Sequence, residues 1–131
     1  MSLRAFGPVI VLALALAGGA EAATCGGEPP AGAAEFRGPV LHVLDGERLC
    51  VALGPDPSEW VPVRLAGGAT RASTAPVPRG ALMAAAFGQD VTCRIVGRDD
   101  EGVIAECVSD RGSLRRLSQR RQAIKAAQAW R

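Results

Sequence analysis

The sequence is poor in the side chains on which many active sites depend. Its 131 residues include a single histidine, His42, so a catalytic triad or dyad that needs an imidazole would have to use this one. His42 lies between the apolar residues Leu41 and Val43, and the sequence indicates no catalytic or metal-binding partners for it. We therefore expect it to be structural. Aromatic residues make up only 4% of the chain, so few are available to stack on nucleic-acid bases.

The chain also lacks the length and hydrophobic runs of several large classes. With 131 residues it forms at most one ordinary domain, which excludes a large cofactor enzyme. The apolar run from Phe6 to about Ala17 is shorter than the ~20 residues of a membrane-spanning helix, and nothing in the composition suggests a multi-pass membrane protein or a coiled coil. A hydrophobic content of 48% suits a globular core, and a net charge of +2 is too small for a polybasic nucleic-acid coat.

Residues 1–22 have the three parts of a secretory signal. Arg4 lies in a short n-region, the apolar run follows, and Ala20-Glu21-Ala22 offers small residues at the two cleavage positions. We therefore expect an exported protein, periplasmic or secreted, whose mature chain begins near Ala23 and has no membrane span. A lipoprotein is disfavoured, because Thr24 precedes Cys25 where Gly or Ala is expected.

All four cysteines lie in the expected mature chain. An even number in a small exported domain indicates two disulfides. Zinc is the alternative, but the sequence has no CxxC pair and its cysteines are widely spread. Spacing alone leaves three pairings open.

Local structure favours one of these pairings. Residues 91–96 and 103–108 are both strand-like, and 97–102 between them are typical of a turn. If the hairpin is centred on Asp100, Cys93 faces Cys107 at a distance within the disulfide range. This pairing, Cys93–Cys107, leaves Cys25 to bond with Cys50.

The remaining pattern predicts a mainly β fold with helices. The predicted strands are 40–44, 49–53, 60–65, 91–96 and 103–108, and the predicted helix is 80–87. Asp45-Gly46 predicts a hairpin turn, and Pro62 indicates an edge or a bulge in the third strand. Residues 23–36 are expected to be an irregular arm, followed by one domain over 37–110.

The C-terminal segment differs from the rest in charge. Residues 23–110 hold seven basic and twelve acidic side chains, whereas 111–131 hold seven basic and none acidic. Apolar residues at Leu114, Leu117, Ile124 and Ala127 predict a helix with one weak apolar stripe. We favour a helix that packs on the body through this stripe, with its basic face solvated or paired. The alternative is an anion-binding tail, for which the candidate residues are Arg115, Arg116, Arg120, Arg121 and Lys125.

Three motifs in order resemble the staphylococcal-nuclease (thermonuclease) family. Asp45-Gly46-Glu47 follows a strand, Val63-Arg64-Leu65-Ala66-Gly67 comes about twenty residues later, and the 91–108 hairpin completes the set. The family pattern is Asp-Gly-Asp-Thr, then Val-Arg-Leu-x-Gly-Ile-Asp-Ala-Pro-Glu, then a hairpin with Tyr-Gly-Arg. The resemblance covers roughly residues 37–112 and implies a five-stranded OB-type barrel, with one short helix before the fourth strand and a C-terminal helix.

The resemblance implies calcium-dependent phosphodiester hydrolysis, and it assigns family roles to particular positions here. The first metal carboxylate falls on Glu47, the first phosphate arginine on Arg64 and the carbonyl ligand on Thr70, and Asp45 matches the first Asp of the motif. Three functional positions are lost: the second metal carboxylate falls on Ala69, the general base on Ala72 and the second arginine on Val103. Shifting the alignment restores nothing, because no acidic residue lies between Arg64 and Asp90.

Arg64 and the acidic hairpin tip complete the candidates. We weigh two roles for Arg64 equally, an ion pair with Glu47 and anion binding. Nothing in the sequence directs the acids of the hairpin tip, Asp99, Asp100 and Glu101, toward Arg64.

Our leading hypothesis is an exported nuclease-like domain without catalytic activity that acts as a binding or structural module. Its partner is unknown, and we expect a monomer with no cofactor and no metal. The alternative is a divergent nuclease that uses Ca²⁺. A further alternative is a binder of nucleic acid or another anionic surface through residues 111–131.

Overall fold

The structure, a computed structural model, describes residues 25–67 and 76–129, and the expected signal at 1–22 lies outside them. The longer strands are β1 (Glu35–Val43), β2 (Arg48–Ala52), β3 (Trp60–Leu65), β4 (Asp90–Asp99) and β5 (Gly102–Ser109). A 3-10 turn, η1 (Pro57–Glu59), precedes β3, and α1 (Arg79–Ala86) precedes β4. A short strand, β6 (Gly112–Ser113), leads into α2 (Leu114–Gln128).

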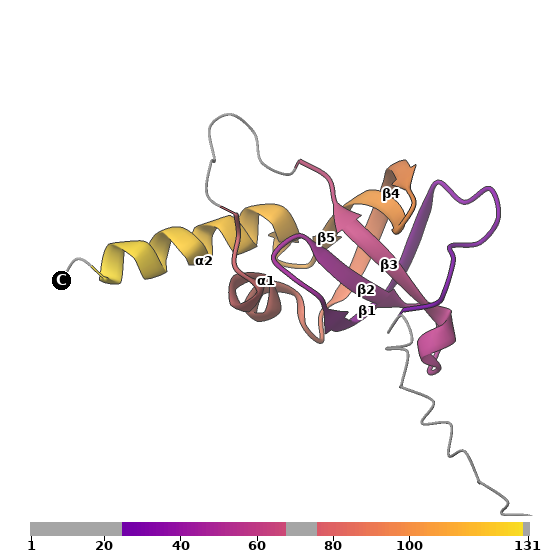
Figure 1. Ribbon diagram of the computed structural model, residues 1–131, viewed down its shortest axis with the longest axis horizontal. Helices are drawn as coiled ribbons and strands as arrows, with labels where there is room; N and C mark the ends of the chain where they lie inside the picture. Colours follow the sequence, from indigo (N-terminus) through magenta and orange to yellow (C-terminus); the bar gives the residue numbers. More distant parts are fainter. Residues whose placement is uncertain (1–24, 68–75, 130–131) are drawn as a thin grey trace, which may run out of the picture.

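The five longer strands close into a mixed β-barrel (Figure 1). They lie in the order β3-β2-β1-β4-β5 with antiparallel neighbours, and a parallel pairing of β3 with β5 closes the ring. The order is consistent with an OB-type barrel, which confirms the predicted fold class.

Strict alternation along β3 shows how the sequence builds the core. Val61, Val63 and Leu65 are buried in the barrel, whereas Arg64 points outward and is exposed. Successive side chains of a strand point to opposite faces, so this alternation fixes Arg64 on the outer surface. Pro62 lies where β3 pairs only with β2, because the pairing with β5 begins at Val63. The missing amide of proline therefore leaves the barrel ladder intact.

Both predicted disulfides are confirmed. Cys93 and Cys107 face each other across β4 and β5, with their Cα atoms 4.0 Å apart, and Cys25 bonds to Cys50 of β2 with a Cα separation of 6.0 Å. All four cysteines are thereby paired, and such bonds are typical of proteins outside the reducing cytoplasm. No helix within residues 25–67 and 76–129 has the length and hydrophobicity to span a bilayer.

Several predicted boundaries are wrong. The first strand begins at Glu35, inside the expected arm, because residues 35–39 pair with β4. The β4–β5 turn is shorter than expected, because a bulge at Val96 shifts the register by one residue and Asp99 then pairs with Gly102. Gly102 approaches Pro62 so closely that a Cβ atom would overlap its carbonyl oxygen. The strand β6 was not predicted.

The C-terminal helix is buried against the body mainly at its first turns, and in its third turn Gln122 donates a hydrogen bond to the Pro76 carbonyl at 3.3 Å. Ser113 caps α2 by accepting a hydrogen bond from the Arg116 amide, and Leu114 is fully buried in the core. The rest of the predicted apolar stripe is not buried: Leu117 is half-buried, and Ile124 and Ala127 are exposed. In Figure 1 α2 crosses above α1 and then extends beyond it, away from the barrel.

Candidate functional site

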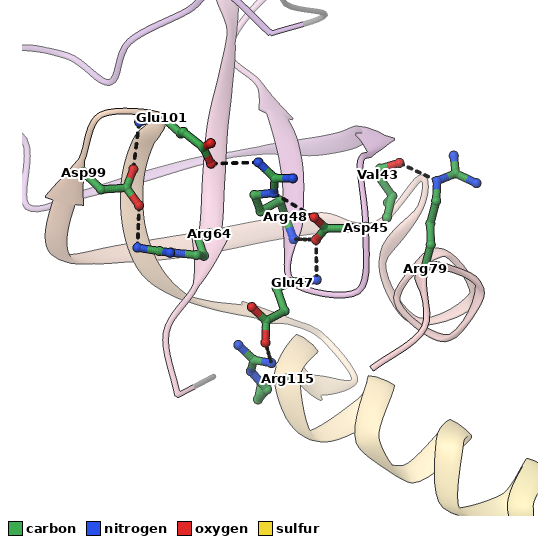
Figure 2. A network of polar contacts seen from close by, with 9 residues as sticks. All are labelled: Val43, Asp45, Glu47, Arg48, Arg64, Arg79, Asp99, Glu101 and Arg115. Carbon is green, nitrogen blue, oxygen red and sulfur yellow. Dashed lines mark hydrogen bonds and ion pairs between the residues drawn. The ribbon is translucent and has the colours of Figure 1, made fainter. Parts of the chain in front are cut away.

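The β1–β2 turn and β3 bring three of the family positions, Asp45, Glu47 and Arg64, to one end of the barrel. Arg48 pairs with Arg64 across β2 and β3, and the Glu47 carbonyl accepts a hydrogen bond from the Leu65 amide at 2.8 Å. The backbones of Glu47 and Arg64 are thus neighbours, but Figure 2 shows their side chains pointing to different partners. The Glu47–Arg64 ion pair, one of the two roles weighed for Arg64, is therefore not formed.

Asp45 is used to hold its own turn. Its Oδ1 accepts hydrogen bonds from the amides of Glu47 and Arg48, each at 2.8 Å, and its Oδ2 accepts one from Arg48 Nε at 2.7 Å. Burial raises the pKa of Asp45, but the hydrogen bonds from Glu47 and Arg48 outweigh it and the pKa lies below its ordinary value. Gly46 is required here, because a Cβ atom would overlap the carbonyl of Val77.

A chain of polar contacts then joins this turn to the β4–β5 hairpin (Figure 2). Arg48 Nη1 donates to Glu101 Oε2 at 2.7 Å, and the Glu101 amide donates to Asp99 Oδ1 at 2.9 Å. Asp99 Oδ2 in turn pairs with Arg64 Nη2 at 2.5 Å. Of the three hairpin acids, Asp99 reaches Arg64, a contact that no feature of the sequence indicated, and it holds the guanidinium within the chain.

Glu47 is paired with the C-terminal helix. Its Oε1 lies 3.6 Å from Arg115 Nη1, and Arg115 also donates to the carbonyls of Leu65, at 2.7 Å, and Ala66, at 3.3 Å. The Arg115 side chain is only 13% exposed, so this residue anchors α2 to the barrel. Sequence reasoning grouped Arg115 with the anion-binding candidates, and the structure separates it from them.

A cleft of about 310 Å³ lies beside these pairs, between β3 and the hairpin tip. Its charged lining consists of two guanidinium groups, Arg48 and Arg64, and three carboxylates, Asp99, Asp100 and Glu101. The carboxylates outnumber the guanidinium groups, so the cleft has no excess of positive charge with which to attract a phosphate.

Calcium does not fit the residues that the structure describes. Ca²⁺ prefers six to eight oxygen ligands, and a site needs several carboxylate or carbonyl oxygens converging on one point. Within residues 25–67 and 76–129 no three side chains of His, Cys, Asp or Glu are grouped to hold a metal. Glu47 faces a guanidinium, and Val103, at the position of the second family arginine, is 2% exposed in the core. Ala69, Thr70 and Ala72 lie outside the described residues.

The exposed face of α2 forms a second charged region of a different kind. Its four exposed cationic residues are Arg116, Arg120, Arg121 and Lys125, which we call the α2 cations. None of them forms an ion pair with another residue in the described part of the chain. Their charge is therefore available to an outside partner.

Comparison with known proteins gives no identification. No protein-family model matches the sequence, and no curated protein is significantly similar to it.

The structural roles of two residues that organise the barrel end were not predicted from the sequence. Arg48 stands three residues after Asp45, a spacing that allows a local ion pair and was a usable signal. Arg115 had no such signal, because its partners are about fifty residues away in sequence and only folding brings them together.

Proposed function

We propose that the protein is an exported, catalytically inactive domain of the staphylococcal-nuclease-like type that acts as a binding module. One observation carries the proposal: each charged family position that the structure describes is held by a partner inside the chain. Asp45 pairs with Arg48, Glu47 with Arg115, and Arg64 with Asp99.

The lost positions support the same conclusion. Ala69 and Ala72 stand where the family pattern has a metal-binding carboxylate and a general base, and no acidic residue between Arg64 and Asp90 could take over either role. Removing one preorganised transition-state donor typically lowers a rate by about 10²–10³-fold, so the combined losses are expected to remove measurable hydrolysis. The two disulfides and the signal-like residues 1–22 support export.

A nuclease assay on the oxidised mature chain, residues 23–131, tests the proposal. Single- and double-stranded DNA and RNA are incubated with calcium and, separately, with chelator, beside an active calcium-dependent nuclease. We expect no cleavage from a sample that unfolds cooperatively. Chelator-sensitive cleavage that disappears in Arg64→Ala and Glu47→Ala would instead establish a divergent nuclease with a different metal site.

The α2 cations favour a second candidate function, the binding of an anionic polymer such as nucleic acid. This candidate is supported by one observation: the α2 cations are exposed and form no ion pair with the described residues. Phosphate contacts by cations predict an affinity that falls steeply with salt, by about one power of salt concentration per contact. Fluorescence anisotropy with a labelled oligonucleotide at several salt concentrations measures this dependence. Charge reversal at Arg116 and Arg120 is the matched variant, because truncating α2 would remove the buried Leu114.

A further inference from the structure

The helices α1 and α2 form a groove that the barrel does not fill. It has a volume of about 1060 Å³ and lies between α1 and the C-terminal half of α2. Its apolar lining includes Ala81 and Ala84 of α1 and Ile124 of α2, which is 59% exposed. In Figure 1 α1 and α2 lie on the left of the barrel, and the β4 label lies on its right.

Two of the four α2 cations line this groove and two do not. Arg121 and Lys125 lie along it together with Ile124, whereas Arg116 and Arg120 are outside its lining. The groove therefore combines an apolar floor with positive charge. A single exposed isoleucine is ordinary on a protein surface, but an exposed apolar surface within a charged groove is typical of a binding site.

The charge of α2 limits what can occupy the groove. The helix carries five cationic residues and no acidic one, so a second copy of α2 would be repelled. A partner with negative charge is favoured. A phosphate backbone would satisfy Arg121 and Lys125 but would leave Ile124, Ala81 and Ala84 in contact with water, because it has no apolar side chains to cover them.

An acidic amphipathic helix meets both requirements. Such a helix places apolar side chains at every third or fourth position and acids on the flanks, which matches an apolar groove with basic residues beside it. We infer that the groove between α1 and α2 binds an acidic amphipathic helical segment of a partner protein. Its apolar side chains pack against Ile124, Ala81 and Ala84, and its carboxylates pair with Arg121 and Lys125. This inference rests on the proposed function as a binding module and names the class of its partner.

The test uses a synthetic peptide of about 18 residues, long enough to form a helix, with Leu at every third or fourth position and Glu on both flanks. Isotope-labelled, oxidised protein is titrated with it to about 1 mM, a concentration at which even weak binding shifts amide signals in NMR spectra. We expect shifts concentrated at Gly80, Ala81, Ala84 and Ile124. A peptide of the same composition in scrambled order, and a single-stranded DNA of similar charge, are titrated in parallel.

Two double variants with the same change of charge provide the sharpest control. Arg121→Glu with Lys125→Glu removes the cations of the groove and should weaken peptide binding at least about tenfold. Arg116→Glu with Arg120→Glu changes the helix charge equally outside the groove and should weaken it less than about threefold. Ala84→Trp, which fills the groove without changing its charge, should also weaken binding about tenfold. All variants are first checked for an unchanged melting temperature.

Three results would overturn the inference. They are the absence of shifts at about 1 mM peptide, equal effects of the two double variants, and equal or tighter binding of the scrambled peptide or the DNA. The last two would assign α2 to charge-driven anion binding. Nuclease activity is measured on the same samples, so metal-dependent cleavage would contradict the proposed function independently of whether the groove binds the peptide.

Discussion

The barrel end and the exposed face of α2 are both rich in arginine but use it in opposite ways. At the barrel end Arg48, Arg64 and Arg115 each face a carboxylate of the same chain. The four α2 cations are exposed and form no ion pair within the described residues. The positions to which the family resemblance assigns function are here used to hold the β1–β2 turn, the hairpin and α2 together. The charge that remains available lies in the basic C-terminal segment, which the charge distribution, and no family motif, had indicated.

We expect the largest effect on stability from a comparison of two alanine substitutions in α2, one at the buried Leu114 and one at the exposed Ile124. Leu114→Ala empties a fully buried position and should lower the free energy of unfolding by about 2–5 kcal/mol. Ile124→Ala, at a position that is 59% exposed, should change it by less than about 0.5 kcal/mol. Urea denaturation followed by circular dichroism measures both. Similar losses would show that the outer half of α2 is also packed on the body.

The disulfide across the β4–β5 hairpin is the next largest contribution that we expect. Replacing Cys93 and Cys107 together by Ala should lower the stability by about 3 kcal/mol, because the bond closes a short loop in the unfolded chain. Thermal unfolding of the oxidised variant measures the loss. Mass spectrometry under non-reducing conditions serves as the control by verifying that Cys25–Cys50 remains. A loss below about 1 kcal/mol would contradict the expectation.

Substitution of Arg115 and of its neighbour Arg116 compares an arginine that is bonded within the protein with one that is exposed. Arg115→Ala leaves the Leu65 and Ala66 carbonyls and the Glu47 carboxylate without their partner, and should cost about 1–3 kcal/mol. Arg116→Ala, the exposed neighbour, should change stability by less than about 0.5 kcal/mol. Chemical denaturation of the two variants side by side is the measurement. Equal values would remove the distinction between the two regions.

Asp45 should give the smallest effect, visible mainly in acid. Because the pKa of Asp45 is lowered on folding, the unfolded chain takes up its proton first, at about the ordinary value of 3.8. Its contribution to stability is therefore complete above that pH and is lost as the pH falls toward the lower folded value. At a side-chain exposure of 43% we expect less than about 1 kcal/mol.

Unfolding of Asp45→Asn between neutral pH and pH of about 3 tests this sign. The variant should lose stability less steeply in acid than the parent protein. Asp100→Asn, at an exposed position in the same polar region, is the matched control. A parallel shift of both variants at every pH would contradict a role for the Asp45 carboxylate.

The sequence was most informative where regular alternation or local symmetry determines the structure. The bounds of β3, Trp60–Leu65, were predicted correctly, and so was the Cys93–Cys107 pairing. The hairpin is centred between Asp100 and Glu101 and not on Asp100, and the bulge at Val96 restores the predicted register at the cysteines. The start of β1 was not predicted, because Gly38 and Pro39 have low strand propensity. In the structure their pairing with β4 outweighs this low propensity. Asp45-Gly46 suggested a tight turn, whereas the Asp45 side chain holds a longer one.

The candidate site was less predictable because its contacts are long-range. The Arg64–Asp99 and Glu47–Arg115 pairs join segments that are far apart in the chain, and no local pattern selects among the available charges. The motifs were sufficient to identify Glu47 and Arg64 as neighbours. They did not indicate the partner of either side chain.

The parallel pairing that closes the barrel also shapes how the protein folds. Val63 and Val103 are partners across about forty residues, so β3 and β5 meet only after a large loop has been ordered. The hairpin of β4 and β5, by contrast, can form early from neighbouring residues. Until the ring closes, the free edge of β3 can pair with another chain, and aggregation competes with folding during that interval. Rapid oxidation of Cys93 and Cys107 would shorten this interval by fixing the hairpin to which β3 must pair.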